Sequence, residues 1–198
     1  MEKIRLFFCT TRQIEKNEDS IKRLLKDNEI SKAARFVRKA DRLLSLGSSY
    51  LKRRFVFGDG DITVSDLGKP YSPDIFFNVS HSVDIVGIAL SDNYEVGLDI
   101  EKERGDYSDL ANHCLSTEEK QSGEDFLTLF TSKESVAKAE GGGLKTDIRD
   151  IPALPLDGRV QYKCKTYYRH GYFKAPYHIS ISLYKTDFYI EEEHINEF

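Results

Sequence analysis

The chain has 198 residues, of which 39% are hydrophobic, and it carries a formal net charge of −4. This hydrophobic content, which includes 12 Phe and 11 Tyr, argues against a disordered chain. It suffices for the core of one domain or of two small halves that share a core. The negative net charge argues against broad nucleic-acid binding.

The cysteines and the apolar runs indicate a cytoplasmic protein. Cys9, Cys114 and Cys164 lie far apart without a Cys-x-x-Cys pair, which argues against a disulfide framework or a zinc site and fits a reducing cytosol. The apolar run within residues 1–9 is too short for a signal peptide, and no run reaches transmembrane length. We therefore expect a soluble, cytoplasmic protein without membrane contact.

The N-terminal part of the chain is expected to form a strand followed by helices. Residues 4–9 have the apolar face of a strand, and residues 11–28 are rich in Lys and Glu, as in a surface helix. Ser31 is a candidate N-cap for a long helix whose apolar residues recur at helical spacing as far as Leu46. Most cations of this helix are expected on a solvated face, but Arg42 lies in its more apolar end, where a charge needs a partner.

The rest of the chain alternates between predicted strands and helices, with a Gly- and Pro-containing turn at residues 67–71. Strands are predicted at residues 62–64, 75–80, 85–90, 96–101, 160–168, 177–184 and 188–190. A short helix is predicted from Ser116, which has the spacing of a capping box with Glu119. A longer helix is predicted over residues 125–140, where three glycines stop it. The chain is therefore of the mixed α+β class.

Two acidic residues share one side of the predicted strand at residues 96–101, whose sequence is Val-Gly-Leu-Asp-Ile-Glu. Because side chains alternate between the two faces of a strand, Asp99 and Glu101 project on the same side. Their repulsion must be offset, and a hard cation such as Mg²⁺, which takes oxygen ligands, is the simplest candidate. The alternative is a strand end whose acidic face meets water or Lys102.

Glu134 and Lys138 lie one turn apart on the predicted helix and therefore share a face. By itself this is an ordinary Glu–Lys pair on a helix surface. If this face meets the strand that carries Asp99 and Glu101, Glu134 completes a cluster of three carboxylates and Lys138 lies beside any anion that a metal holds. Such a centre suits phosphoryl chemistry, in which metal and lysine neutralise developing negative charge.

Further cations and hydrogen-bond donors lie in two other segments. Residues 78–82, Asn-Val-Ser-His-Ser, supply two hydroxyls, backbone N–H groups and an imidazole next to a turn. A lone histidine is more often structural, but His81 between two serines is well placed to hold a phosphate. Lys69 is another cation, on the Gly-Lys-Pro loop. An acidic metal centre ringed by separated cations suits a substrate with more than one phosphate group.

Taken together, these segments resemble the Sfp-type 4′-phosphopantetheinyl transferases. The matching segments follow the order found in the family and span residues 66–144: Gly68-Lys69-Pro70, Phe77-Asn78-Val79-Ser80-His81-Ser82, Val96-Gly97-Leu98-Asp99-Ile100-Glu101, Ser116-x-x-Glu119 and Lys133-Glu134-Ser135-x-x-Lys138-x-x-Gly141-x-Gly143-Leu144. Upstream, the helix with Ala40-Asp41-Arg42 agrees. Each segment alone is a weak signal, whereas all of them in order are specific.

The resemblance implies transfer of the phosphopantetheine arm of coenzyme A, the co-substrate, to a serine hydroxyl of a carrier protein, with release of 3′,5′-ADP. It implies that Asp99, Glu101 and Glu134 hold Mg²⁺, with Mn²⁺ as an alternative, on the pyrophosphate. It also implies two catalytic residues: Glu134 helps to remove the proton of the carrier serine, and Lys138 neutralises the pyrophosphate. Since that hydroxyl has a pKa far above neutrality, base and metal must act together.

The coenzyme A site implied by the resemblance also uses residues nearer the N-terminus. Ser80 would contact a phosphate. Cationic side chains would hold the 3′-phosphate and the adenylate end, namely His81, Arg42, Lys69 and Lys32. The chain departs from the family pattern at Phe130, where the family often has Trp, and the cations of the helix before Arg42 do not all align.

The family fold consists of two similar α+β halves related by a pseudo-twofold, with coenzyme A in the cleft between them. We therefore expect an N-terminal half at residues 1–92 and a C-terminal half at residues 93–198, which holds the metal-binding acids and the catalytic helix. The family also implies a monomer. The polar segment 103–123 does not identify the docking surface for the carrier, so acyl, peptidyl and polyketide carriers all stay open.

Two other functions are compatible with the same residues. A Mg²⁺-dependent nucleotide phosphohydrolase would use the three acids with water as the acceptor. The chain lacks the P-loop pattern Gly-x-x-x-x-Gly-Lys-Ser/Thr, which disfavours a standard NTPase. A non-catalytic protein that binds coenzyme A or a nucleotide would use the basic segment 32–54. Such a protein would not need the complete set of acids with Lys138, and we therefore favour the transferase.

Overall fold

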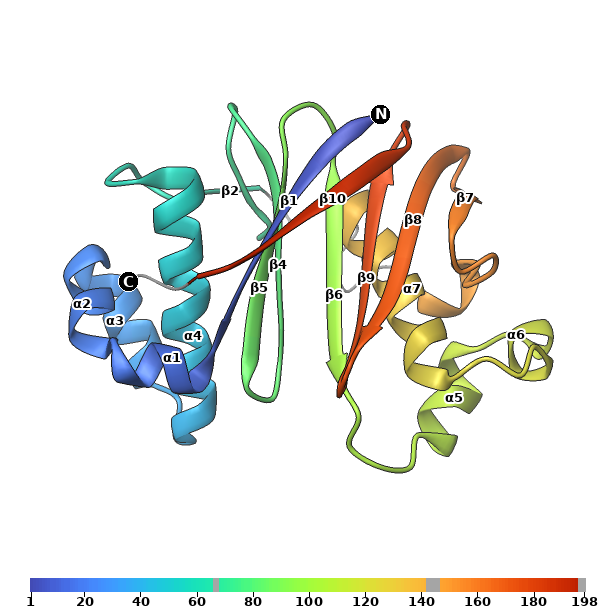
Figure 1. Ribbon diagram of the computed structural model, residues 1–198, viewed down its shortest axis with the longest axis horizontal. Helices are drawn as coiled ribbons and strands as arrows, with labels where there is room; N and C mark the ends of the chain where they lie inside the picture. The colour runs from blue at the N-terminus through green and yellow to red at the C-terminus, as the bar shows by residue number, and fades with distance from the viewer. Residues whose placement is uncertain (66–67, 142–146, 196–198) are drawn as a thin grey trace.

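The computed structural model describes residues 1–65, 68–141 and 147–195, which form layers of helices and sheets (Figure 1). Two sheets lie side by side at the centre, and helices cover the outer face of each. Apolar side chains pack between the two sheets and between each sheet and its helices. This arrangement confirms the mixed α+β class. No helix in the described ranges combines the length and the apolar character needed to cross a bilayer.

The strands are β1 (Glu2–Thr10), β2 (Thr63–Val64), β3 (Pro70–Tyr71), β4 (Phe76–Ser82), β5 (Ile85–Ser91), β6 (Val96–Lys102), β7 (Gly158–Tyr162), β8 (Lys165–Lys174), β9 (Tyr177–Tyr184) and β10 (Phe188–His194). In this part of the chain, one sheet has the order β10-β1-β5-β4 and the other β6-β9-β8-β7, while β2 and β3 form a short ribbon. Neighbouring strands are antiparallel except β1 and β10, which are parallel.

The helices are α1 (Thr11–Lys16), α2 (Glu18–Leu24), α3 (Asp27–Ala34), α4 (Lys39–Lys52), α5 (Ser108–Cys114), α6 (Thr117–Gln121) and α7 (Phe126–Glu140), with a π-helical turn η1 (Arg53–Phe57) after α4 and a 3₁₀ turn η3 (Ile148–Asp150). Helices α1 to α4 cover the sheet that contains β1, and α7 covers the sheet that contains β6 (Figure 1). Helix α7 is capped by Asp125 and, as predicted, ends at Gly141, whose φ of 85° is left-handed. The next two glycines lie outside the described residues.

The helices before residue 52 differ from those predicted. The expected helix at residues 11–28 is broken at Asn17 into α1 and α2, and Ser31 lies inside α3 instead of capping a helix. The expected long helix is interrupted after α3, because Phe36 and Val37 are 44% and 100% exposed and provide no buried apolar face there. Hydrophobic spacing alone therefore overestimated the length of this helix.

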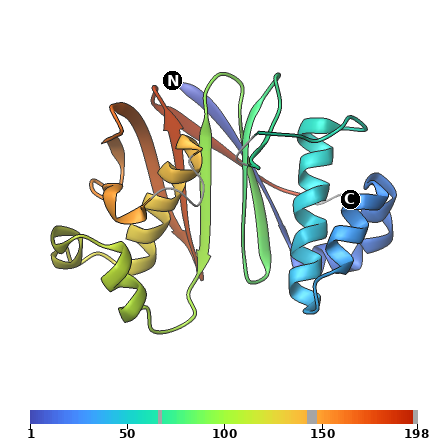
Figure 2. The same ribbon diagram turned by 180° about the vertical axis from the view of Figure 1, so that it is seen from behind.

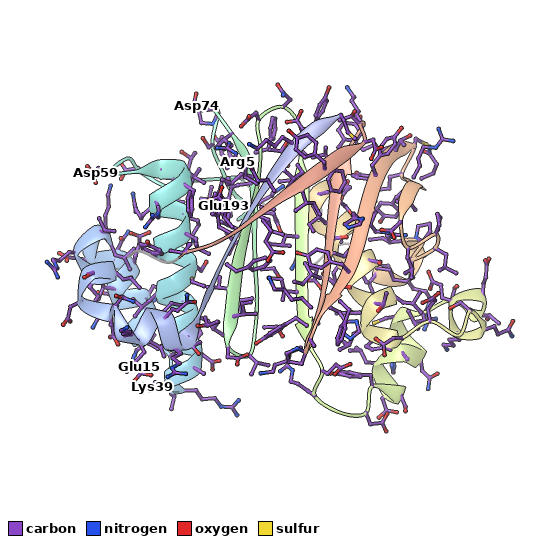
Figure 3. The ribbon with its side chains drawn as sticks, viewed as in Figure 1. Arg5, Glu15, Lys39, Asp59, Asp74 and Glu193 are labelled. Carbon is purple, nitrogen blue, oxygen red and sulfur yellow. The ribbon has the colours of Figure 1, made fainter. Side chains whose placement is uncertain are left out.

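Helix α4 begins only at Lys39, which forms an ion pair with Glu15 of α1. Both side chains lie together at one end of the helical layer (Figure 3). The segment predicted as one strand at residues 160–168 is a hairpin of β7 and β8, whose two turn residues, Lys163 and Cys164, have positive φ. Helix α5 forms within the polar segment 103–123, where no helix before Ser116 was predicted.

The C-terminal strand does not stay with the C-terminal half. Strand β10 pairs with β1, with Glu2 opposite Phe188 and Ile4 opposite Ile190, so it extends the sheet of the N-terminal half. The boundary expected at residue 92 separates β5 from β6, which belong to different sheets, but it does not separate the sheets at the end of the chain. The two halves are therefore joined by a strand as well as by side-chain packing.

Candidate active site

Helix α7 lies directly against strand β6 (Figure 2). Small residues occupy the contact. At Gly97 a Cβ atom would lie 1.9 Å from the backbone oxygen of Ser135, so this approach requires glycine. The Oγ atom of Ser135 is 3.0 Å from that of Ser180 and 2.7 Å from that of Ser182, both on β9. The contact brings the side chains of α7 beside the acidic face of β6.

Asp99 is buried at this contact and has a cation as its partner. The Nζ atom of Lys138 on α7 is 2.5 Å from Asp99 Oδ1. The hydroxyl of Ser80 on β4 donates to the same oxygen at 3.3 Å and accepts from Lys138 Nζ at 3.0 Å. Asp99 Oδ2 is buried and has no hydrogen-bond partner. One oxygen of this carboxylate is therefore left for a ligand.

Glu101 lies two residues further along β6 and is only partly buried. Its Oε2 atom accepts a hydrogen bond from Ser82 Oγ at 2.8 Å and lies 3.2 Å from Arg104, which is exposed. An exposed ion pair contributes little to stability and exchanges readily with solvent. The contact with Arg104 therefore leaves Glu101 able to bind a ligand.

Glu134 faces these acids from α7, as the resemblance to the family implied. Its side chain is half-buried, and this burial raises its pKa above the ordinary value. The negative charges of Asp99 and Glu101 raise the pKa further, while the positive charge of Lys138 opposes them. The structure thus brings together the three predicted acids and the predicted lysine.

These side chains line one cavity of about 320 Å³, which we call the acidic cavity: Val79, Ser80, His81, Asp99, Glu101, Phe130, Glu134 and Lys138. Its carboxylate oxygens, one of them buried and unpaired, are the donors that a hard divalent cation prefers. In the conformation described here, no three Asp, Glu, His or Cys side chains of the described residues already converge as metal ligands. Lys138 supplies a positive charge at Asp99.

Strand β4 joins β6 through side chains in place of its backbone. Three side chains of β4 each accept a hydrogen bond from a backbone N–H of β6: Asn78 Oδ1 from Leu98 (3.1 Å), Ser80 Oγ from Ile100 (3.2 Å) and Ser82 Oγ from Lys102 (3.1 Å). This ladder satisfies backbone donors on the edge of β6 that faces away from β9. Ser80, predicted to contact a phosphate, therefore has its hydroxyl engaged in holding the two sheets in register.

His81 lies on the opposite side of β4 from Ser80 and is exposed. Although the residue is exposed, neighbouring protein atoms partly desolvate its ring, and this desolvation together with the positive charge of Lys138 lowers the pKa of the imidazole. Besides the acidic cavity, His81 lines a second cavity of about 200 Å³, which we call the basic cavity: Lys32, Phe36, Asp41, Leu44, Ser45, Ser48, Ser49, Lys52 and His81. The structure thus brings Lys32 and His81 together, as predicted.

Lys52 is a residue of this cavity that sequence reasoning missed. It lies at the end of α4, eleven positions after Asp41, and an interval of three helical turns returns a residue to the same face. Because Asp41 had no predicted role, this spacing did not point to Lys52.

Arg42 does not reach the basic cavity. It lines a separate cavity of about 340 Å³ between α2, α3 and α4, together with Glu18 and Lys22, which form an ion pair with each other at 2.6 Å. The Nε atom of Arg42 is buried without a hydrogen-bond partner. The structure therefore does not bring Arg42 together with His81, with which the sequence analysis grouped it.

Lys69 lies at the other end of β4, away from His81. Its Nζ atom is 2.8 Å from Glu95 and donates to the backbone oxygen of Lys138 at 3.3 Å. It lines a cavity of about 570 Å³, which we call the aromatic cavity and which includes Tyr71, Phe76, Phe77, Tyr167 and Tyr184. The aromatic, acidic and basic cavities thus follow one another along β4, from Phe76 to His81.

Two further residues of the predicted motifs form a buried ion pair. Lys133 on α7 is fully buried, and its Nζ atom lies 2.8 Å from Glu119 and donates to the backbone oxygen of Ile151 at 2.7 Å. Glu119 also closes the predicted capping box by accepting from the N–H of Ser116 at 2.7 Å. This pair ties α6 and the segment after η3 to α7 and does not line any of the three cavities.

Comparison with known proteins agrees with this geometry. Residues 95–191, which include β6 and α7, match the 4′-phosphopantetheinyl transferase superfamily. The YieE protein of Escherichia coli is 35% identical over 116 residues, covering 51% of this chain and 47% of YieE. The 4′-phosphopantetheinyl transferase Sfp of Bacillus subtilis is 30% identical over 146 residues, covering 64% of this chain and 63% of Sfp.

The 4′-phosphopantetheinyl transferase AcpT of Salmonella typhimurium is 34% identical over 134 residues, covering 60% of this chain and 67% of AcpT. The chain thus spans about half to two thirds of the length of these curated relatives. With the family match over β6 and α7 and this coverage of AcpT, the chain belongs to the 4′-phosphopantetheinyl transferase superfamily.

Proposed function

We propose that this protein transfers the 4′-phosphopantetheine arm of coenzyme A to a serine hydroxyl of an acyl, peptidyl or polyketide carrier protein and releases 3′,5′-ADP. The observation that carries the proposal is the acidic cavity, where Glu134 and Lys138 of α7 face Asp99 and Glu101 of β6. Three acids and one lysine around a single cavity suit a reaction in which negative charge moves between phosphate oxygens.

The three carboxylates are the proposed holders of a divalent cation. Asp99, Glu101 and Glu134 would hold Mg²⁺ or Mn²⁺, which would supply neutralising charge at the pyrophosphate oxygens. The buried, unpaired oxygen of Asp99 supports this assignment. Ser80 would position Asp99 and Lys138, which it contacts directly.

The proposed reaction breaks one bond and forms one. The serine oxygen of the carrier forms a bond to the phosphorus that bears the pantetheine, and the bond from this phosphorus to the bridging oxygen breaks. The bridging oxygen leaves with 3′,5′-ADP. Glu134 accepts the serine proton, directly or through a water molecule, and Lys138 neutralises the charge that develops on the departing phosphate.

The sequence of cavities along β4 indicates how coenzyme A would lie. The pyrophosphate would occupy the acidic cavity, and the adenylate end would extend past His81 to Lys32 in the basic cavity. The pantetheine arm would then leave towards Lys69 and the aromatic cavity. This direction moves Lys69 from the adenylate end, where the sequence analysis placed it, to the side of the arm.

Intact-mass analysis of a purified apo carrier protein tests the proposal. The carrier is incubated with this protein, coenzyme A and MgCl₂, and a parallel sample contains EDTA. We expect a mass gain of one phosphopantetheine group per carrier, and we expect EDTA to abolish it. An acyl carrier and a peptidyl carrier are tested in parallel, since the sequence does not select between them.

The same experiment separates the alternatives. Release of 3′,5′-ADP without any gain in carrier mass would indicate a phosphohydrolase. Binding of coenzyme A without turnover on either carrier would indicate a binding protein. The monomeric state, the cytoplasmic location and the lack of nucleic-acid partners stay predictions from the sequence.

A further inference from the structure

Two serines of β4 each hold one carboxylate of the acidic cavity by a single oxygen. Ser80 donates to Asp99 Oδ1 at 3.3 Å, and Ser82 donates to Glu101 Oε2 at 2.8 Å. The serines are two residues apart on β4, as the acids are on β6, and alternation along a strand gives each pair a common side. The two strands therefore match one serine to each acid.

The backbone of β6 fixes both hydroxyl groups. Ser80 Oγ accepts a hydrogen bond from the N–H of Ile100 at 3.2 Å, and Ser82 Oγ accepts one from the N–H of Lys102 at 3.1 Å. Both serines are buried. A hydroxyl group has a single proton, which each serine donates to the carboxylate beside it. Each serine therefore links a carboxylate to the backbone of the strand that carries it.

Glu101 depends on this link more than Asp99 does. Asp99 is buried and is also held by Lys138 at 2.5 Å. Glu101 is only partly buried, and its ionic partner, Arg104, is exposed and contributes little to holding it. A glutamate side chain has several rotamers, and fixing one of them costs conformational entropy. The hydrogen bond from Ser82 is therefore the contact that orients the Glu101 carboxylate.

This contact leaves the other oxygen of Glu101 for a ligand. In the described part of the chain, the hydrogen bonds to Glu101 come from Ser82 and Arg104, and both fall on Oε2. Glu101 lines the acidic cavity, whereas Ser82 is not among the described residues that line it. Ser82 therefore acts on a ligand in this cavity through Glu101 and not by direct contact.

We propose that Ser82 is a positioning residue for the divalent cation, because it holds Glu101 by Oε2 and leaves Oε1 in a fixed orientation to bind the ion. The inference rests on the proposed function, since it takes Asp99, Glu101 and Glu134 as the holders of Mg²⁺ or Mn²⁺. It goes further by giving a role to Ser82, which has none in the proposed reaction. A partner that orients a ligating side chain typically contributes about ten- to a hundredfold to metal affinity.

Binding of Mn²⁺ tests this inference without turnover of a carrier. MnCl₂ is titrated into the protein in the presence of coenzyme A, and free Mn²⁺ is measured by its electron paramagnetic resonance signal. A titration of coenzyme A alone is the blank. We expect Ser82→Ala to raise the dissociation constant for Mn²⁺ about tenfold. Ser82→Thr keeps the hydroxyl group and should retain most of the affinity.

Asn78→Ala is the matched control, because it removes a neighbouring link between β4 and β6 that involves no carboxylate. Asn78 Oδ1 accepts from the N–H of Leu98 at 3.1 Å. Asn78→Ala and Ser82→Ala each leave one backbone N–H of β6 without its acceptor, but only Ser82→Ala should weaken Mn²⁺ binding. If Ser82→Ala does not fold, as judged by circular dichroism, Ser82→Cys, whose thiol is a weak donor, takes its place.

An unchanged affinity for Mn²⁺ in Ser82→Ala would overturn the inference. An equal loss in Ser82→Ala and Asn78→Ala would also overturn it, since the joining of the two strands would then account for the effect. If the wild-type protein with coenzyme A binds no more Mn²⁺ than the blank, the proposed metal site and this inference fail together. If the wild-type protein modifies the carrier with Mg²⁺ while Ser82→Ala binds Mn²⁺ normally, the inference alone fails.

Discussion

Helix α7 carries two lysine–carboxylate pairs whose surroundings differ. The pair of Lys133 and Glu119 is enclosed, with side chains 0% and 6% exposed. Both Glu119 oxygens are engaged, because Oε1 accepts from the N–H of Ala153 at 2.7 Å and Oε2 from that of Ser116. The pair of Lys138 and Asp99 lies at the wall of the acidic cavity, with the lysine side chain 29% and the aspartate side chain 5% exposed.

The difference shows how to separate structural from chemical residues within one motif. A pair whose hydrogen-bonding groups are all used has no capacity left for a ligand, and it can only hold elements together. The pair of Lys138 and Asp99 leaves Asp99 Oδ2 unpaired and has Glu134 beside it. That incompleteness, and not membership of the motif, distinguishes the pair that can still bind a ligand from the pair that only holds elements together.

The largest expected effect is the loss of turnover when the proposed proton acceptor of the acidic cavity, Glu134, is removed. Glu134→Gln keeps the shape of the side chain but cannot accept a proton at neutral pH. We expect turnover of the carrier to fall by about 10²- to 10⁴-fold, the range for loss of a general base, with coenzyme A binding and unfolding midpoint preserved. Carrier mass gain against time measures the rate. Glu124→Gln, at an exposed position before α7, is the control and should keep normal turnover. Near-normal turnover of Glu134→Gln would remove Glu134 from the mechanism.

We call the pair of Lys133 and Glu119 the closed pair and the pair of Lys138 and Asp99 the open pair. Breaking the closed pair is expected to lower stability more than turnover. Lys133→Met leaves Glu119 buried without its counter-ion, which typically costs about 3–5 kcal/mol of folding free energy. Urea denaturation followed by circular dichroism measures the loss.

Lys138→Met is the matched variant on the same helix. It leaves Asp99 next to the cavity, and we expect it to lose much less stability and to lose turnover instead. Equal loss of stability in the two variants would show that the open pair is as structural as the closed one.

The acidic cavity could be predicted from the sequence because two of the three steps depend on local periodicity. The alternation in β6 places Asp99 and Glu101 on one face, and the helical repeat places Glu134 and Lys138 on one face. The family resemblance supplied the remaining step, that these two faces meet. Gly97, part of the matching segment, is the physical reason why they can meet closely.

The region around α4 could not be predicted in the same way. Apolar spacing continued through Phe36 and Val37, but tertiary structure leaves both exposed and ends α3 before them. The change in helix direction decides which cations face His81, and no local pattern encodes that direction. Lys32 therefore lies in the same cavity as His81, as expected from the sequence, whereas Arg42 lines another cavity and Lys52 had no predicted role.

The close contact between α7 and β6, which brings the open pair together, can be tested at Gly97. In Gly97→Ala the new Cβ atom would meet the backbone of Ser135 at 1.9 Å, and neither element can shift without moving the acids apart. We expect a loss of about 3 kcal/mol in urea denaturation, typical of severe overpacking, together with loss of turnover.

Gly171→Ala on β8 is the matched control for this prediction. The nearest atom to its new Cβ would be the backbone oxygen of Ile179 at 3.8 Å, an ordinary contact. We expect a change within about 0.5 kcal/mol. If both substitutions have equally small effects, the approach of α7 to β6 does not depend on glycine.

The smallest expected effect is a change in how the free energy of unfolding depends on pH, caused by the closed pair of Lys133 and Glu119. Burial alone would raise the pKa of Glu119, but hydrogen bonds from Lys133 and from the N–H groups of Ser116 and Ala153 outweigh it and lower the pKa below its ordinary value of 4.5. The unfolded chain therefore binds this proton more readily than the folded protein. The stabilisation is present above pH 4.5 and is lost as the pH falls towards the folded-state pKa, at no more than about 1.4 kcal/mol per pH unit for one proton.

Lys133→Met should weaken this dependence, because the hydrogen bond that lowers the pKa of Glu119 is gone. We expect the free energy of unfolding between pH 5 and pH 3, measured with urea at each pH, to fall less steeply in Lys133→Met than in the wild-type protein. Glu124→Gln, which removes an exposed carboxyl group, should retain the wild-type slope. An unchanged slope in Lys133→Met would mean that Glu119 takes its stabilisation from the backbone N–H groups alone, and the closed pair would then be a backbone cap beside which Lys133 is only packed.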